Sequence, residues 1–157
     1  MSAVEDRLAE LGLSVPEVAK PVAAYVPAVR DGNLIFTSGQ LPMVSGALVR
    51  TGKVGEGQGL VPAEDAKKLA ETCALNAIAA VRSVIGDLDK VTRVVKVVGF
   101  VASDPAFTGQ PGVINGASEL LGKAFGDAGV HARSAVGVAV LPLNAPVEVE
   151  ITVSVQD

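Results

Sequence analysis

The stretch KVTRVVKVVGFVAS at residues 90–103 decides how this chain folds. It is rich in β-branched residues, which favour an extended strand. Its apolar side chains form two opposed sets: Val94, Val98 and Phe100 against Val95, Val97 and Val101. A strand that is this apolar on both faces belongs inside a sheet, away from water. We therefore expect residues 90–103 to form a central strand that is covered on both sides.

Amphipathic helices are predicted on either side of this strand in the sequence. Residues 62–86 repeat apolar side chains at helical spacing, on a face formed by Ala66, Leu69, Cys73, Ala77, Val81 and Val84. A second helix carries Val113, Ile114, Leu120, Leu121 and Phe125, and Gly126 or Gly129 is expected to end it. A short leading helix is predicted from Ser2 and Glu5, which fit a capping box.

Further strands are predicted near both ends of the chain. Residues 22–39 contain two strand-like runs around Asp31-Gly32, a dipeptide that suits a tight hairpin turn. Two more strands, at 133–142 and 147–155, close the chain. The glycine-rich stretch between Gly39 and Pro62 is expected to be a long loop, and loops of this length are often functional.

The order of elements predicts an α+β fold with one uncovered sheet face. Two helices can cover one face, and the chain has no further segment to cover the other. A second copy of the protein is the simplest cover, so we expect a symmetric homo-oligomer. A carrier domain or another partner remains an alternative.

Composition limits the classes of function. The chain has 157 residues and a net charge of -4, with 13 scattered lysines and arginines, so a nucleic-acid surface is not expected. We predict one domain over residues 1–157, with a helical extension at 1–20. The N-terminus does not resemble a secretion signal and no segment is apolar enough to span a membrane. The single cysteine, Cys73, suits a reducing cytoplasm, and its place on a helix's apolar face predicts a buried structural role.

Three segments resemble the RidA family, also called the YjgF, YER057c and UK114 family. They are YVPAVRDGNLIFTSGQLPM (25–43), INGASELLGKAF (114–125) and ARSAVGVAVLPLNAPVEVEI (132–151), in the family's order and approximate spacing. The resemblance implies a ferredoxin-like, chorismate-mutase-like mixed β-sheet with two helices on one face. It also implies a homotrimer with ligand sites in the clefts between subunits, and no metal or organic cofactor.

The resemblance further implies an enamine and imine deaminase, which hydrolyses small intermediates such as 2-iminobutanoate to 2-oxo acids and ammonia. Carried over by position, Arg133 resembles the arginine that grips the substrate carboxylate, and Glu148 resembles the acid that holds the attacking water. Cleft-lining positions are matched by Tyr25, Ser38, Gly39 and Asn115.

This chain also departs from the family pattern. Ala135 stands where the archetype has a cysteine, and Gly137 where it has an acidic residue. The leading helix and the longer loop at 46–62 are additional. These differences indicate a divergent branch whose substrate can differ.

The candidate residues suit imine hydrolysis chemically, although each has an ordinary structural alternative. A guanidinium donates two parallel hydrogen bonds to a carboxylate, but Arg133 could instead be a surface arginine paired with Glu148 or Glu150. Glu148 can take a proton from water, whereas Glu150 is expected on a solvated strand face.

The other candidates have structural alternatives too. Tyr25 could fill core space, Gly39 could serve a turn and Asn115 could serve packing. Ser38 has no nearby histidine and is expected to donate hydrogen bonds. His131, the only histidine, is predicted to be a loop residue.

Other functions are also compatible with the sequence. One alternative is a trimer that binds a small carboxylate, or acts as a chaperone, without turnover. A ribonuclease or translation inhibitor is disfavoured by the acidic charge and the scarcity of aromatic residues.

Overall fold

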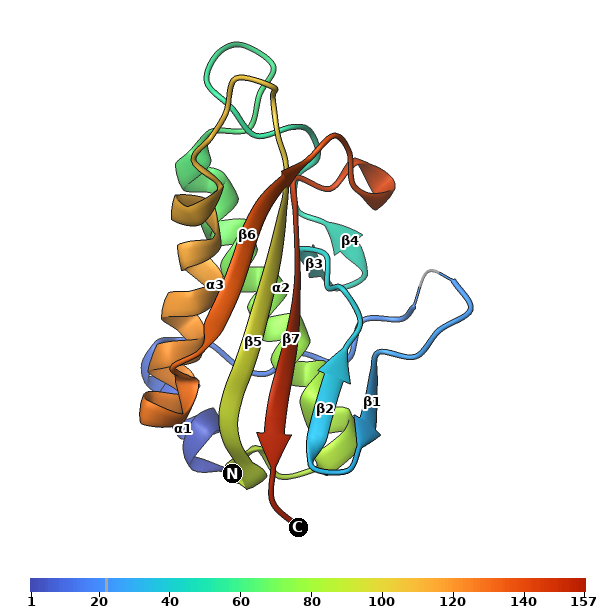
Figure 1. Cartoon of the computed structure of the whole chain (residues 1–157), viewed down its shortest axis with the longest axis vertical. Helices are drawn as coiled ribbons and strands as arrows, with labels where there is room; N and C mark the ends of the chain where they lie inside the picture. Colours follow the sequence, from blue (N-terminus) through green and yellow to red (C-terminus); the bar gives the residue numbers. More distant parts are fainter. Residues whose placement is uncertain (22) are drawn as a thin grey trace.

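A five-stranded mixed sheet backed by helices forms the centre of the molecule (Figure 1). The computed structural model describes residues 1–21 and 23–157, so Val22, within the first predicted strand run, lies outside the described residues. The strand order is β1-β2-β7-β5-β6, and only the β5–β6 pair is parallel. The strands are β1 (Ala28–Asp31), β2 (Leu34–Thr37), β5 (Val91–Ala102), β6 (Ala132–Val138) and β7 (Val147–Val155). The α+β class and the mixed sheet are as predicted.

Strand β5 is an inner strand, as expected, but its side chains divide between the faces differently from the prediction. Two register shifts, between Val91 and Arg93 and between Val94 and Lys96, interrupt the alternation. A bulge inserts an extra residue, so Val94 faces the same side as Val97 and not the side of Val98. Val94 and Val97 are fully buried, whereas Val98 is only partly buried. Within one chain, β5 is therefore covered on one face alone.

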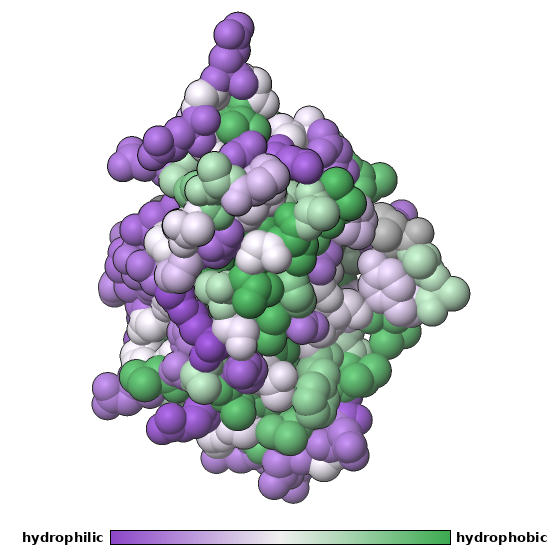
Figure 2. All heavy atoms as spheres, turned by 45° about the horizontal axis from the view of Figure 1, so that its top comes forward, coloured by the Kyte–Doolittle hydropathy of each residue, from purple (hydrophilic) through white to green (hydrophobic). Residues whose placement is uncertain are grey.

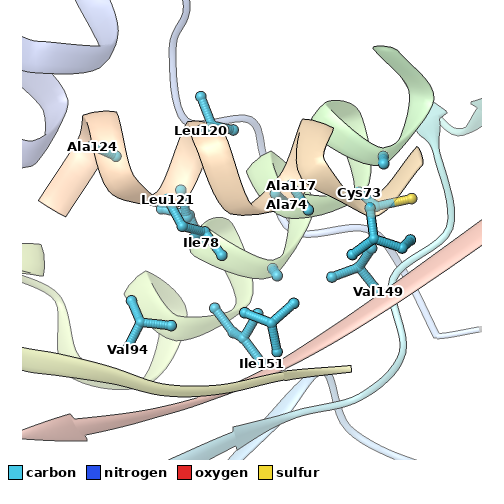
Figure 3. Close-up of a cluster of buried hydrophobic side chains, with 14 of the residues drawn as sticks. Cys73, Ala74, Ile78, Val94, Ala117, Leu120, Leu121, Ala124, Val149 and Ile151 are labelled. Carbon is cyan, nitrogen blue, oxygen red and sulfur yellow. The ribbon is translucent and has the colours of Figure 1, made fainter. Parts of the chain in front are cut away.

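Helices α2 (Ala63–Ile85) and α3 (Gln110–Phe125) pack on that covered face. Figure 3 shows Ile78 of α2 and Leu121 of α3 meeting above Val94 and Ile151 of the sheet. The two helices approach closely at Gly116, where any Cβ would collide with the backbone carbonyl of Lys67. The predicted apolar faces are buried, except that Val84 is 38% exposed. Gly86 and Gly126 are the C-caps of the two helices.

Helix α1 (Ala3–Glu10) confirms the predicted capping box. The Ser2 hydroxyl accepts from the Glu5 amide, and the Glu5 carboxylate accepts from the Ser2 amide. Arg82 of α2 pairs with Glu5 at 2.8 Å, which ties the extension to the helix layer. Val4 and Leu8 are buried against that layer, so α1 is a third helix on the covered side.

The N-terminal hairpin and the long loop differ in detail from the prediction. The two-residue turn is Gly32-Asn33, and Asp31 is already paired with Leu34 in the strands. Gly32 has a φ of 58°, which suits glycine at the first position of such a turn. The long loop also contains a two-residue hairpin, β3 (Met43–Val44) with β4 (Ala47–Leu48).

The second face of the sheet carries interleaved apolar and acidic side chains. Val29, Phe36 and Val136 are 50%, 41% and 43% exposed there. We call this second face of the sheet the open face. A band of apolar surface is visible on this side of the molecule in Figure 2. Among the residues that the structure describes, short 3-10 turns lie at Leu88–Lys90, Gly126–Gly129 and Pro142–Asn144. Within residues 1–21 and 23–157, no helix is long and apolar enough to cross a membrane.

Candidate functional site

Arg133 lies near the start of the edge strand β6 and points toward the helices. Its register partner is Val97, whose side chain is buried on the helix side. The Arg133 Nη1 donates to Ser118 Oγ at 3.2 Å, and Nη2 donates to the Pro111 carbonyl at 3.0 Å. Both acceptors belong to α3, so this helix fixes the direction of the guanidinium.

Asn115 lies on the same face of α3 as the two residues that hold Arg133. Pro111, Asn115 and Ser118 are spaced at i, i+4 and i+7, which brings them to one side of a helix. Asn115 is partly buried. The structure thus brings together two predicted residues, Arg133 and Asn115, and we call this cluster with Ser118 the arginine half-site.

Glu148 lies in the middle strand, β7, on the open face. It is opposite Phe100 in the β5–β7 register, and its neighbours Val147 and Val149 point into the core. The carboxylate lies directly over Gly39. A Cβ on Gly39 would stand 2.6 Å from Oε2 of Glu148, so only glycine leaves room for this arrangement.

The pKa of the Glu148 carboxyl is raised above its usual value. Partial burial is the main cause, because it penalises the charged form, and the neighbouring negative charge of Glu150 adds to it. A carboxylate with a raised pKa holds a proton more strongly, so it can accept one from water and return one to a leaving nitrogen. Glu150 therefore influences the site although it was predicted only to be solvated.

Tyr25 and Ser38 lie close to Gly39, the residue over which the Glu148 carboxylate stands. Ser38 Oγ donates to the Val26 carbonyl at 2.6 Å, and the Ser38 amide donates to the Pro27 carbonyl at 2.8 Å. These bonds bring the segment around Tyr25 against the end of β2. A small pocket of about 30 Å³ has Tyr25 and Gly39 in its lining. We call Tyr25, Ser38, Gly39 and Glu148 the glutamate half-site.

Asn76 supports the glutamate half-site from beneath and was not identified from the sequence. Its side chain is 3% exposed, and Nδ2 donates to the carbonyls of Leu41 and Met43, both at 3.0 Å. Gln40, directly before Leu41, bridges to Val149 through both backbone groups. An asparagine within an apolar helix face was the only signal in the sequence that could have pointed to this role.

His131 is also more than a loop residue. It lies between the turn at Gly126–Gly129 and β6, as predicted, but its ring reaches α3. Its Nε2 lies 2.8 Å from Ser118 Oγ, the atom that also accepts from Arg133. The sequence contained no spacing signal that links residues 118, 131 and 133.

The two half-sites lie on opposite faces of one sheet. Arg133 shares the side of Val97, whereas Glu148 shares the side of Phe100. In the described part of the chain, Arg133 makes no ion pair with Glu148 or Glu150, so that surface alternative is not realised. A small ligand cannot contact both residues within one chain.

The two departures from the family pattern lie beside the arginine half-site. At Gly137 a Cβ would stand 2.7 Å from the Nε2 of Gln110 and 3.1 Å from Ser103 Oγ. These polar groups occupy the space in which a longer side chain would start. Ala135 packs against the core cluster.

Cys73 is fully buried and takes no part in either half-site. Burial raises the pKa of its thiol, and the charge of Glu148 adds to that effect. A thiol that stays protonated is a poor nucleophile, which agrees with the predicted structural role. Across the described residues, no three histidine, cysteine, aspartate or glutamate side chains are placed to hold a metal ion.

Comparisons with known proteins decide the family. The family model described as "YjgF/chorismate_mutase-like, putative endoribonuclease" matches residues 5–154. The chain belongs to the YjgF/chorismate-mutase-like family.

Three relatives in this family are informative. Protein TCP17 of Trypanosoma cruzi is 41% identical over 98% of this chain and 95% of its own length. A 2-iminobutanoate/2-iminopropanoate deaminase of Dermatophagoides farinae is 32% identical over 92% of this chain and 95% of its own. The crystal structure of Atu1372 from Agrobacterium tumefaciens, a protein described as of unknown function, is 47% identical, with a TM-score of 0.90 over 98% of this chain and 93% of that one.

Proposed function

We propose that the protein hydrolyses small 2-imino and 2-enamino acids to 2-oxo acids and ammonia. Glu148 is the observation that carries this proposal. It is a partly buried carboxylate with a raised pKa, held over Gly39 on the sheet's open face. The relative from Dermatophagoides farinae, which matches this chain over nearly its whole length, is named 2-iminobutanoate/2-iminopropanoate deaminase and so supports the same activity here.

The chemistry requires a carboxylate anchor and a base. Water adds to the C=N carbon while Glu148 takes one of its protons and passes it to the imine nitrogen, which gives a carbinolamine. The carbinolamine hydroxyl then gives up its proton, which Glu148 transfers to the amine nitrogen as the C–N bond breaks. The net reaction consumes one water and yields one 2-oxo acid and one ammonia. Arg133 would hold the substrate carboxylate, since its bonds to Ser118 and Pro111 use only two of the five N–H groups of a guanidinium in the described part of the chain.

The active assembly in this proposal is a homotrimer with sites between subunits. Two observations support it: Arg133 and Glu148 face opposite sides of the sheet, and the open face leaves Val29, Phe36 and Val136 about half exposed. A second copy that covers the open face would bring its arginine half-site to the first copy's glutamate half-site. We place this assembly in the cytoplasm, where the lone Cys73 would stay reduced.

A coupled assay tests the activity. An amino-acid dehydratase generates 2-aminoacrylate or 2-iminobutanoate, and the release of the 2-oxo acid is followed with and without this protein. We expect faster release with the protein and no acceleration with Glu148→Gln. Rates equal to the buffer blank across several imines would refute the proposal.

A trimer that binds a small carboxylate without turnover is the second candidate. The filled space at Gly137, where Gln110 and Ser103 stand, favours it because a second acidic group is missing there. In that case calorimetry would detect 2-oxobutanoate binding that depends on Arg133, while the coupled assay would show no acceleration.

A further inference from the structure

Three side chains and one carbonyl form a continuous hydrogen-bonded chain at the arginine half-site. His131 Nδ1 lies 2.6 Å from the Gly129 carbonyl, and its Nε2 lies 2.8 Å from Ser118 Oγ. Arg133 Nη1 donates to the same oxygen at 3.2 Å. The chain therefore runs from a backbone carbonyl to the guanidinium.

The direction of each hydrogen bond follows from the two ends. The Gly129 carbonyl can only accept, so His131 Nδ1 carries a proton, and in an imidazole with a single ring proton Nε2 is then the acceptor. Ser118 donates its hydroxyl proton to Nε2, and its oxygen is then free to accept from Arg133. Each of these three hydrogen bonds then has one donor and one acceptor.

The Gly129 end of this series of hydrogen bonds is rigid. Gly129 is buried, and a Cβ there would collide with the Leu121 carbonyl at the end of α3. The carbonyl that orients His131 is therefore fixed by packing against the same helix that carries Ser118. The arginine is held at its other nitrogen by Pro111, which also belongs to α3.

We propose that Ser118 and His131 are positioning residues that hold the Arg133 guanidinium ready for a substrate carboxylate. This inference rests on the proposed role of Arg133 in binding that carboxylate. A long arginine side chain loses much rotational freedom when it binds. A guanidinium already fixed by neighbouring groups loses less, so its affinity for a carboxylate is higher.

The expected effect falls on binding more than on chemistry. Ser118 and His131 act on the substrate only through Arg133, so their loss should raise KM and leave kcat nearly unchanged. We expect Ser118→Ala to weaken 2-oxobutanoate binding by about 5-fold to 10-fold, the size of one lost hydrogen bond of ordinary strength. In an Arg133→Ala background the same substitution should have no further effect.

Two substitutions at His131 distinguish the effect of its hydrogen bond to Ser118 from the effect of local packing. Glutamine can place an acceptor near the position of Nε2, so His131→Gln should retain most of the affinity. Asparagine reaches only the Nδ1 position and can keep the Gly129 contact alone, so His131→Asn should behave like Ser118→Ala. Ser83→Ala is a matched control, because Ser83 is a helix serine whose hydroxyl, among the described residues, donates to the Ala80 carbonyl of its own helix α2 and not to either half-site.

Calorimetry with 2-oxobutanoate and nitrogen NMR of the imidazole test the proposal on the intact protein. NMR should show the neutral ring protonated at Nδ1 in the wild type. Protonation at Nε2, or unchanged binding in Ser118→Ala and His131→Asn, would overturn the positioning role. If the wild type shows no imine turnover while Ser118→Ala and His131→Asn weaken binding as expected, the deaminase proposal alone is refuted. A wild type that hydrolyses the imines but does not bind 2-oxobutanoate would overturn the carboxylate-binding role of Arg133 and the positioning role with it.

Discussion

Gly39 and Glu148 are in such close contact that the identity of one depends on the other. The carboxylate of Glu148 lies where a side chain on residue 39 would begin, with Oε2 2.6 Å from a Cβ placed there. Gly39 has no left-handed φ that would require glycine for its backbone. Glycine is therefore required at position 39 because its lack of a side chain leaves room for the Glu148 carboxylate.

Gly39→Ala should displace the Glu148 carboxylate and so reduce imine hydrolysis by about 10-fold to 100-fold, within the range of a misplaced catalytic group. A crystal structure of the variant, together with kcat, would measure the displacement and its effect. Gly122→Ala is the matched control, since a Cβ there meets nothing within 4 Å. It lies inside α3, so alanine should raise stability by about 0.5–1 kcal/mol without changing kcat. Full activity in Gly39→Ala would contradict the proposed dependence.

Glu148→Gln should lower kcat by about 100-fold or more, because an amide cannot act as a base. The same change should stabilise the fold at neutral pH, by less than about 1 kcal/mol because water screens a side chain that is only partly buried. The native carboxyl has a raised pKa, so its ionised form is disfavoured in the folded state. The gain should be largest above that raised pKa and disappear below the ordinary value of 4.5. Thermal unfolding of both proteins from pH 4 to 8 would show whether the gain follows this course.

Arg133→Ala should weaken 2-oxobutanoate binding by about 2 to 5 kcal/mol, as expected when a paired charge loses its partner. Arg133→Lys should not restore binding, because an ammonium lacks the planar two-bond fork and cannot reproduce the bonds to Ser118 and Pro111 together. Calorimetry of the three proteins would decide. Recovery of affinity in the lysine variant would show that charge alone is sufficient.

Mixed assemblies should recover activity if each site takes Arg133 from one subunit and Glu148 from another. Arg133→Ala and Glu148→Gln, each inactive alone, would be unfolded together and refolded as mixed trimers. Random mixing restores about a quarter of the sites, because one interface in each mixed trimer contains both native residues. The double variant mixed with itself is the control and should remain inactive. An inactive mixture would argue for sites within one subunit.

Acid should weaken the attachment of α1. The pKa of Glu5 is lowered from 4.5 to about 2, chiefly by hydrogen bonds from Ser2 and then from Arg82. A lowered pKa means that this stabilisation is complete above about pH 4.5 and is lost as the pH falls toward 2. Ser2→Ala should cost about 1 kcal/mol at neutral pH. Glu5→Gln should flatten the fall in unfolding free energy between pH 4.5 and 2, measured by urea titration.

The sequence was sufficient to predict the elements and the class of fold. The two long helices, their C-caps at Gly86 and Gly126, and the capping box at Ser2 all follow from local chemistry that acts within a few residues. The last strand also has the predicted alternation, with Val147 and Val149 buried on one side and Glu148 partly exposed on the other. These features depend on spacing along the chain, which the sequence contains directly.

The prediction failed where residues distant in sequence determine the local geometry. The bulges in β5 arise from its pairing with β7, so Val94 could not be assigned to the correct face from alternation alone. Asn76 and His131 find their partners in a loop and in α3, at separations that no motif fixes. The family resemblance suggested that Arg133 and Asn115 belong to one site. That Arg133 of β6 bonds to α3, the helix that carries Asn115, is visible only in the fold.

Because Arg133 and Glu148 face away from one another across the sheet, ligand binding and subunit association are linked in the proposed assembly. A ligand that needs both residues binds only the associated form, so it draws dissociated chains together. Affinity should then fall as the protein is diluted below its association range, and saturating 2-oxobutanoate should shift that range to lower concentration. A mutation on the open face that belongs to neither half-site, such as one at Val29, should weaken ligand binding by weakening association.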